Sequence, residues 1–372
     1  MTDLDRLLEE SLKSARDRYR TELTEDRVEA KTRFLRRYRR RRFVLYSSTV
    51  VAAAGLSVLL AFLVVDPSGG SRDQVERPED PAGKPSVGVS IPLPSTPDEV
   101  VISASSAWVS SSEARVVYRI DLATNEVVDE IQTGGTPGDI EAGATTVWIA
   151  NPELGEIQRY DIASGTLIEP IPIEASDSLE VAIRDESLWA VADRSDLVRL
   201  EVGTDELVPV VTTSPPIDVA IDQAGRVWVL QTGGNVVQFD PATGEPLPPS
   251  AAAASGADDI SSGNDAVWLG GTGSGSLIRI DHDSRKVRTI DLDGEYVDLA
   301  LSDKGTWVLT SDGQGAGLLL PLWLQDQGHT GEPVPVEGEP VEVAAGGGYL
   351  WVATTNADAV LKIAAPEPPA GL

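Results

Sequence analysis

The sequence contains no cysteine and only two histidines, His282 and His329. The absence of cysteine excludes disulfide bonds, thiolate-bound zinc, a cysteine nucleophile and lipidation of an N-terminal cysteine. Two histidines are too few for most imidazole-rich metal sites. The sequence also lacks H-E-x-x-H, G-x-S-x-G and P-loop motifs, and it has no G-x-G-x-x-G between a strand and a helix. A non-enzymatic role is therefore favoured over catalysis.

Positive charge is scarce over most of the chain. The 372 residues include 30 Lys and Arg against 59 Asp and Glu, so the formal net charge is −29. Residues 1–42 are the exception, with 14 bases and 9 acids, and residues 43–65 carry no charge at all. Residues 66–372 hold 16 bases and 50 acids. A basic end, an uncharged strip and an acidic end indicate a membrane protein with two different sides.

The uncharged strip, FVLYSSTVVAAAGLSVLLAFLVV, predicts a single transmembrane helix over residues 43–65. As a helix it would span about 34 Å, which is enough for a hydrocarbon core of roughly 30 Å. A cleaved signal peptide is the main alternative, but the strip is long for a signal sequence and no cleavage pattern follows it. A buried core helix is the second alternative, which the complete lack of charge disfavours.

A run of arginines directly before the strip predicts its orientation, because positive charge stays on the cytoplasmic side of a membrane. Residues 1–42 are then a basic, helical cytoplasmic segment, and everything after the strip lies outside the cell. We expect the arginines to face lipid headgroups rather than nucleic acid. They are Arg36, Arg37, Arg39, Arg40, Arg41 and Arg42. Residues 66–85 are rich in Pro, Gly and charge, which predicts a disordered linker.

Seven tryptophans recur at intervals of about forty residues, which is the period of a propeller blade. They are Trp108, Trp148, Trp189, Trp228, Trp268, Trp307 and Trp351. Each lies in a short apolar run, with a second run before it and a third run and a tight turn after it. Four short strands per unit, repeated seven times, predict an all-β, seven-bladed β-propeller. The tryptophans are expected to pack between blades.

The seventh unit has only three strands before a Pro-rich tail, whereas an extra strand precedes the first unit. We therefore expect the strand at 87–92 to complete the last blade by pairing beside residues 359–363. Such closure removes the free sheet edges that would otherwise invite aggregation. The propeller is predicted over residues 86–364, followed by a disordered tail at 365–372.

The segment IDLATNEVVDEIQTGGTPGDIEAGATTVWIAN, residues 120–151, closely resembles the YVTN-type propeller repeat. It is also similar to repeats of NHL-like and streptogramin-lyase-like propellers, and the resemblance covers residues 86–364. It implies the fold but no single activity, because members of these families bind proteins, glycans or small molecules and only some catalyse. Streptogramin-lyase-like chemistry relies on histidine and glutamate around a metal. Here both histidines are expected away from the acidic residues described next.

A carboxylate stands nine or ten residues before each repeat tryptophan, at the start of the innermost strand. These seven residues, here named the acidic ring, are Glu99, Asp139, Glu180, Asp218, Asp259, Asp298 and Glu342. Two interpretations stay open. Each acid could accept a backbone hydrogen bond from the neighbouring blade, or the seven together could bind a cation, a polyamine or a basic peptide. A hard cation such as Ca²⁺ would suit oxygen ligands, although no cofactor is assigned.

The sixth unit is longer than the others and contains the apolar stretch LLLPLWL, residues 318–324. Leu320 and Trp323 are candidate partner contacts if this stretch forms an exposed loop. Alternatively, the stretch is simply the third strand, distorted by Pro321.

These features predict a single-pass membrane protein that presents a propeller outside the cell to a protein, an envelope polymer or a cation. The alternative is a transmembrane regulator with an anti-sigma-like topology that senses an external ligand. A metal-dependent, lyase-like enzyme comes third. No nucleic-acid partner is expected.

Overall fold

The computed structural model describes residues 88–365, except for 104, 185–186, 202–203, 253–255, 264, 303–304 and 324–328. Within this part of the chain every regular element is a strand, and no helix long and apolar enough to cross a membrane is found. The expected cytoplasmic helix 1–42 with its six arginines, the membrane span 43–65 and the linker 66–85 lie outside the described residues. So does the tail after residue 365.

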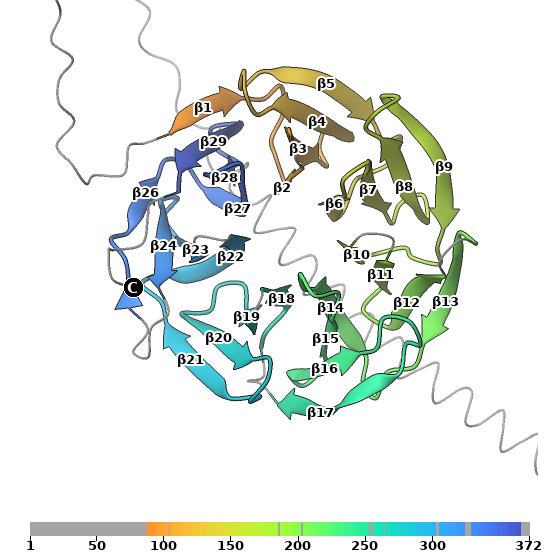
Figure 1. Cartoon of the computed structure of the whole chain (residues 1–372). Coiled ribbons are helices and arrows are strands. Elements are labelled where there is room, and N and C mark those ends of the chain that lie inside the picture. The colour runs from red at the N-terminus through yellow and green to blue at the C-terminus, as the bar shows by residue number, and fades with distance from the viewer. Residues whose placement is uncertain are drawn as a thin grey trace, which may run out of the picture. The chain divides into compact units, whose positions relative to one another are not determined.

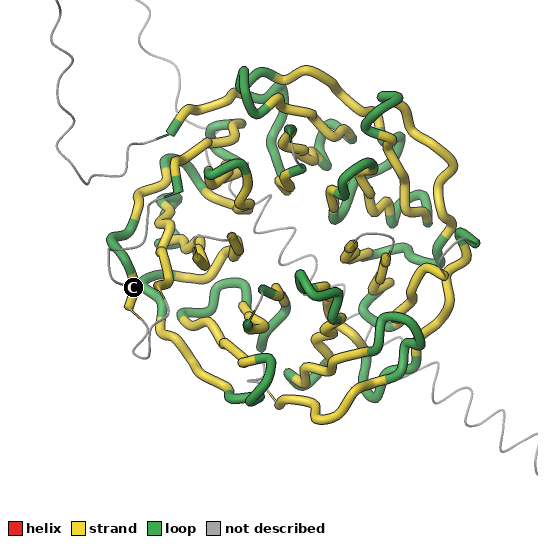
Figure 2. The backbone as a smooth tube through the Cα atoms, viewed as in Figure 1, coloured by secondary structure: helices red, strands yellow, loops and turns green. Residues whose placement is uncertain are grey.

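The described residues form seven antiparallel sheets arranged in a ring, which confirms the seven-bladed propeller (Figure 1). In each blade the strands follow one another outward from the ring axis and are joined by loops (Figure 2). Blades 1 to 5 have four strands each, in sequence order. The short apolar runs and the Gly, Asn and Asp residues between them account for this pattern of brief strands and tight turns.

The first, innermost strands are β2 (Glu99–Ile102), β6 (Ile140–Ala142), β10 (Leu179–Arg184), β14 (Pro216–Ile221), β18 (Asp259–Ser262), β22 (Glu295–Ser302) and β27 (Pro340–Gly346). The second strands are β3 (Ser106–Ser111), β7 (Thr146–Asn151), β11 (Ser187–Ala192), β15 (Val227–Gln231), β19 (Ala266–Gly270), β23 (Gly305–Ser311) and β28 (Tyr349–Thr354). The third strands are β4 (Val116–Asp121), β8 (Glu156–Asp161), β12 (Asp196–Glu201), β16 (Asn235–Phe239), β20 (Ser276–Asp281), β24 (Gly317–Trp323) and β29 (Ala359–Ala364). The outer strands are β5 (Val127–Gln132), β9 (Thr166–Pro172), β13 (Glu206–Val210), β17 (Pro246–Ala252), β21 (Val287–Asp291), β25 (His329–Thr330) with β26 (Val334–Val336), and β1 (Val89–Pro92).

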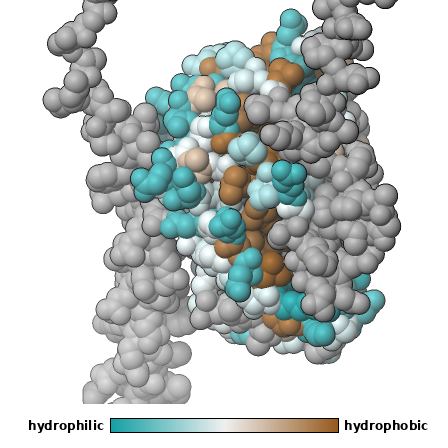
Figure 3. All heavy atoms as spheres, turned by 90° about the vertical axis from the view of Figure 1, so that its left-hand side faces the viewer, coloured by the Kyte–Doolittle hydropathy of each residue, from teal (hydrophilic) through white to brown (hydrophobic). Residues whose placement is uncertain are grey.

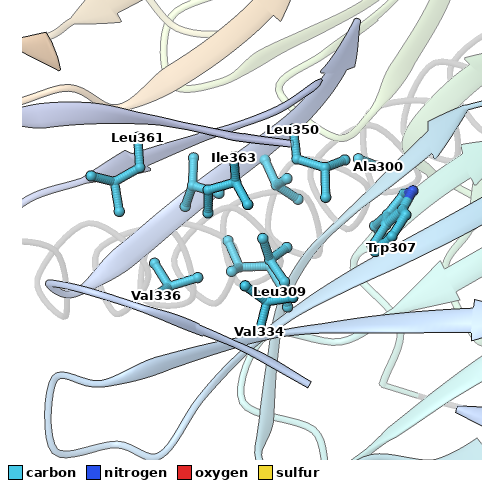
Figure 4. Packing of buried hydrophobic residues seen from close by; sticks show 11 residues of the cluster. Ala300, Trp307, Leu309, Val334, Val336, Leu350, Leu361 and Ile363 are labelled. Atoms are coloured by element: carbon cyan, nitrogen blue, oxygen red, sulfur yellow. The ribbon is translucent and has the colours of Figure 1, made fainter. Parts of the chain in front are cut away.

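Each repeat tryptophan lies on a second strand and packs toward the following blade. Trp108 of blade 1, for example, packs with Ile140 and Tyr160 of blade 2. Six of the seven indoles are almost completely buried, and only Trp148 is half-buried. Figure 4 shows the corresponding cluster between blades 6 and 7 around Trp307. The expected packing between blades is therefore confirmed, and it buries both faces of sheets that could not be stable alone.

The ring closes through β1, which pairs antiparallel with β29 of the last blade (Figure 1). The register runs from Val89 opposite Lys362 to Pro92 opposite Ala359. Lys362 reinforces the same seam, because its Nζ donates to the carbonyl of Leu122 in blade 1 at 2.7 Å. The two ends of the propeller are thus held by a strand pair and by a buried lysine.

Residues 318–323 of the stretch LLLPLWL belong to the third strand of blade 6 and not to an exposed loop. β24 pairs with β23 from Gly317 to Leu322, and Leu320 is 2% exposed within the core. Leu320 is therefore a packing residue, whereas the side chain of Trp323 is not among those described. The outer strand of this blade is divided into β25 and β26. Figure 3 shows this side of the ring, where apolar residues form a band bordered by polar ones.

Substitution of Gly88 should weaken ring closure. A Cβ atom at Gly88 would overlap the backbone carbonyl of Lys362 on β29. We expect Gly88→Ala to lower the free energy of unfolding by about 1–3 kcal/mol, measured by chemical denaturation. Gly275→Ala is the matched control, because a Cβ there meets open space. Equal stability of the two variants would contradict this account of the closure.

Candidate functional site

The acidic ring lies on or next to the innermost strands, which adjoin one another around the ring axis (Figure 1). All seven carboxylates are half-buried. They lie toward the end of the propeller at which the chain enters each innermost strand. The loops between second and third strands reach the same end, because successive strands of each blade are antiparallel. This end is called the acidic face below.

The carboxylates fasten one blade to the next. Glu99 Oε2 accepts the backbone N–H of Ile140 at 3.1 Å, and Asp139 Oδ2 accepts that of Val181 at 2.6 Å. In both cases the donor follows the ring acid of the next blade. The same bond recurs from Ile260 to Asp218 (3.1 Å) and from Val343 to Asp298 (2.8 Å). A backbone N–H on the inner edge of a sheet has no strand to pair with, so the acid supplies its acceptor.

Asp259 contacts the next blade through a side chain. The hydroxyl of Tyr296, in blade 6, donates to Asp259 Oδ2. The Tyr296 ring is buried directly against Gly270, where a Cβ atom would collide with it. Glycine at 270 therefore makes room for the aromatic ring that carries this hydrogen bond.

The ring acids repel one another, and burial together with this repulsion raises the pKa of some of them. Burial, followed by the charges of Glu99 and Glu180, raises the pKa of Asp139 well above its usual value. Burial and the charges of Glu180 and Asp259 do the same to the pKa of Asp218. Charged carboxylates at this spacing repel one another, and the innermost strands keep them from separating.

Glu141 is an eighth carboxylate that the sequence interpretation missed. It lies two residues after Asp139, opposite Trp148, where the other blades have Val, Ala or Ser. Burial and the charge of Glu99 raise its pKa to about 8. A comparison of the repeats position by position would have found this single exception.

The loops of the acidic face add further negative charge. Besides the ring acid Asp139, they contain 12 acids and two bases, Arg115 and Arg194. The 12 acids are Asp98, Glu113, Glu153, Glu174, Asp177, Asp193, Asp258, Asp293, Asp312, Glu337, Glu339 and Asp358. Some are structural: Asp193 accepts backbone N–H groups from Ser176 and Asp177, which hold its pKa below the usual value despite partial burial. Among the described residues, no group of three acids or histidines is arranged to hold a metal ion.

Cations on the third strands are a second feature that the sequence interpretation missed. The guanidinium of Arg119 lies 5.2 Å from the ring centre of Trp108, the residue opposite it in the ladder. The same arrangement recurs at Arg159 over Trp148, Arg279 over Trp268 and Lys362 over Trp351. These basic side chains stack on the tryptophans within the blades. They lie near the turns that end the third strands, at the opposite end from the acidic face.

His282 belongs to a buried polar cluster between blades 4 and 5, away from the acidic ring. Its ring stacks on Trp228, and Arg226 approaches its Nδ1 at 2.6 Å. A guanidinium can only donate, so Nδ1 accepts and Nε2 carries the hydrogen, which then points to Ser262 Oγ at 3.3 Å. In this tautomer His282 cannot take a proton from Ser262. The grouping with the buried Asp222 is therefore not a catalytic triad.

Comparisons with known proteins show the fold alone. No family model and no curated protein matches the chain. Among solved structures, virginiamycin B lyase from Staphylococcus aureus is 15% identical with a TM-score of 0.61, over 73% of this chain and 96% of that one. A chain of the mitotic checkpoint complex is 13% identical with a TM-score of 0.64, over 84% and 100%. The propeller domain of Cps50 (Swd1) from Myceliophteria thermophila is 10% identical with a TM-score of 0.64, over 76% and 100%.

Neutralising Glu141 should stabilise the protein at neutral and high pH but not at pH 4. Its pKa is about 8 when folded and near 4.5 when unfolded, so the loss of folding free energy is absent below pH 4.5, grows between pH 4.5 and pH 8 and is complete above pH 8. We expect Glu141→Gln to raise the free energy of unfolding above pH 8 by roughly 3–5 kcal/mol. At pH 4 it should change nothing.

The measurement is unfolding of the full chain across this pH range. Glu113→Gln removes one charge from an exposed position of the same face and serves as the control. A stabilisation by Glu141→Gln that does not depend on pH would contradict the raised pKa.

Proposed function

We propose that this chain is a non-enzymatic binding protein, held in the membrane by one span at residues 43–65, with its propeller outside the cell. We further propose that the acidic face binds a positively charged segment of a partner protein. The sequence supports the membrane anchor through the charge-free strip and the arginines before it. The structure supports a scaffold role through its rigid ring of packed blades.

The observation that carries the proposal is the convergence of seven carboxylates on one end of the ring, surrounded by loops with 12 further acids and two bases. The raised pKa of Asp139, Asp218 and Glu141 means that their ionised forms are destabilised by burial and mutual repulsion. A cationic group placed among them would relieve that repulsion, and the field would also attract it from a distance.

A basic peptide segment fits this arrangement better than a single metal ion or an uncharged polymer. The ring oxygens that accept backbone N–H groups are already directed into the blades. Lysine and arginine side chains can instead reach several carboxylates at separate positions. The propeller in the mitotic checkpoint complex, which shares only the fold, is itself part of a protein assembly.

Neutralising three ring acids should weaken binding of a polycation. Asp139→Asn, Asp218→Asn and Asp298→Asn together remove three ionisable carboxylates but keep an oxygen that can accept the interblade N–H bonds. We expect the affinity for oligolysine to fall about tenfold or more, equivalent to roughly 1.4 kcal/mol. Isothermal titration calorimetry of the full chain in detergent measures this effect.

The matched control places the same three charge changes at the other end of the ring, as Asp121→Asn, Asp240→Asn and Asp281→Asn. These residues cap the turns between third and outer strands, and asparagine can accept the same backbone bonds. An equal loss of binding in both triple variants would mean that only net charge matters. The acidic face would then not be the site.

Membrane topology can be tested with single cysteines, because the chain has none of its own. We expect a membrane-impermeant thiol reagent to label Ala123→Cys, at an exposed turn of the propeller, in intact cells. Ser14→Cys should be labelled only after the membrane is permeabilised. The reverse pattern, or labelling of both sites in intact cells, would contradict the proposed orientation.

A further inference from the structure

The outer strand of each blade has a free edge that faces away from the ring. Its outward N–H and C=O groups could pair with a strand from another chain. Natural sheets block such edges with proline, bulges or side chains that occupy the outward groups. The seven outer strands can therefore be compared for these blocking features, to find any strand whose outer edge has none of them.

Five of the seven blades carry proline in the outer strand. Pro92 lies in β1, and the neighbouring Leu93 bonds inward to Asp358, so the proline faces the free edge. Pro172 has the same position in β9, beside the inward-bonded Ile173. The remaining prolines are Pro170 in β9, Pro209 in β13, Pro246, Pro248 and Pro249 in β17, and Pro335 in β26.

β5 has no proline but is blocked in two other ways. Its ladder contains an irregularity between Arg119 and Ile120, where the pairing skips Val128. Farther along the strand, the N–H of Glu130 is already taken by the side chain of Asp129 at 2.9 Å. The edge of blade 1 therefore offers no continuous row of donors.

β21 of blade 5 is left open. It pairs with β20 in an uninterrupted register, and among the described residues no strand pairs with its other edge (Figure 1). The flanking bonds from Asp281 to Lys286 and from Leu292 to Gly275 fix which residues bond inward. By alternation, Val287, Thr289 and Asp291 direct their N–H and C=O groups outward, and all three are exposed.

We propose that β21 is a docking edge for a second copy of this chain, which adds its own β21 in antiparallel orientation. With Thr289 facing Thr289 of the second copy, each Val287 faces the other copy's Asp291. These are the residues whose backbone groups point outward, so every outward donor finds an acceptor. The pairing is two-fold symmetric, as closed dimers require.

Charge also favours this pairing. Lys286 and Arg288 lie just before and within the start of β21, and Asp291 and Asp293 lie at its end and just after it. Antiparallel copies therefore bring the basic end of one strand near the acidic end of the other. The bases and the acids alternate to opposite faces of the sheet, so this attraction acts across the edge without direct cross-strand side-chain pairs. A single strand pair buries less than the roughly 1,600 Å² of a standard stable interface. We therefore expect a weak dimer that becomes populated as the local concentration rises.

The test compares full-length protein in detergent with two variants by sedimentation velocity over a range of concentrations. Thr289→Pro removes an outward donor without touching the β20–β21 ladder, and we expect it to weaken dimerisation about tenfold or more. Ser90→Pro makes the same change on the edge of β1, which Pro92 already blocks, and should leave the dimer intact. A monomer at all concentrations, or a dimer unaffected by Thr289→Pro, would overturn the proposal.

Cross-linking tests the register itself. In the proposed pairing the two Thr289 Cα atoms lie about 5.5 Å apart, within the span of a disulfide bond. Thr289→Cys, the only cysteine in the chain, should form a covalent dimer on oxidation, whereas Ser90→Cys should not. Equal cross-linking of both variants would indicate random collision. Binding of another protein's strand to β21 of a monomeric chain would show that the partner is not a second copy. Either result would overturn the proposal.

Discussion

The backbone amides at the inner edge of each blade impose the constraint on which the arrangement around the ring axis depends. These groups have no neighbouring strand, and a buried donor without an acceptor costs about 1–3 kcal/mol. The carboxylates of Glu99, Asp139, Asp218 and Asp298 meet the need by accepting N–H groups from the following blade. Negative charge is thereby built into the ring as part of its hydrogen bonding.

That solution has an electrostatic cost, on which the proposed binding of a cationic segment depends. Repeating an acid at the same position in seven blades brings like charges together, and burial together with these charges raises the pKa of Asp139 and of Asp218. Glu141 adds to the repulsion without replacing any of these contacts. The folded ring holds these carboxylates close together despite their burial and mutual repulsion, and a cationic partner would reduce that repulsion. The structural role and the proposed binding role of the same residues are therefore compatible.

Between the blades the dominant interaction is burial of apolar surface. Each indole fills the space toward the following blade, and a basic side chain from the third strand covers several of them. The unpaired backbone groups at the inner and outer edges of the sheets are capped or blocked in different ways. Side-chain carboxylates cap the inner edge, whereas proline or local irregularity blocks most outer edges and leaves β21 open.

The spacing of tryptophan, the short strands between turns and the surplus strand at 87–92 were enough to predict seven blades and the closing pair, because a repeat must bury the same faces in every unit. The seven acids could be placed on or next to the innermost strands for the same reason. The sequence could not show which amide each acid accepts, since these bonds join residues about forty positions apart. Only the tertiary structure revealed that Leu320 is buried and that Glu141 lies near the ring acids. It also showed that Arg226 donates to Nδ1 of His282, so that the other ring nitrogen of His282 donates to Ser262. Those properties depend on which side chains of different blades come into contact, and contacts across a ring have no local signature in the sequence.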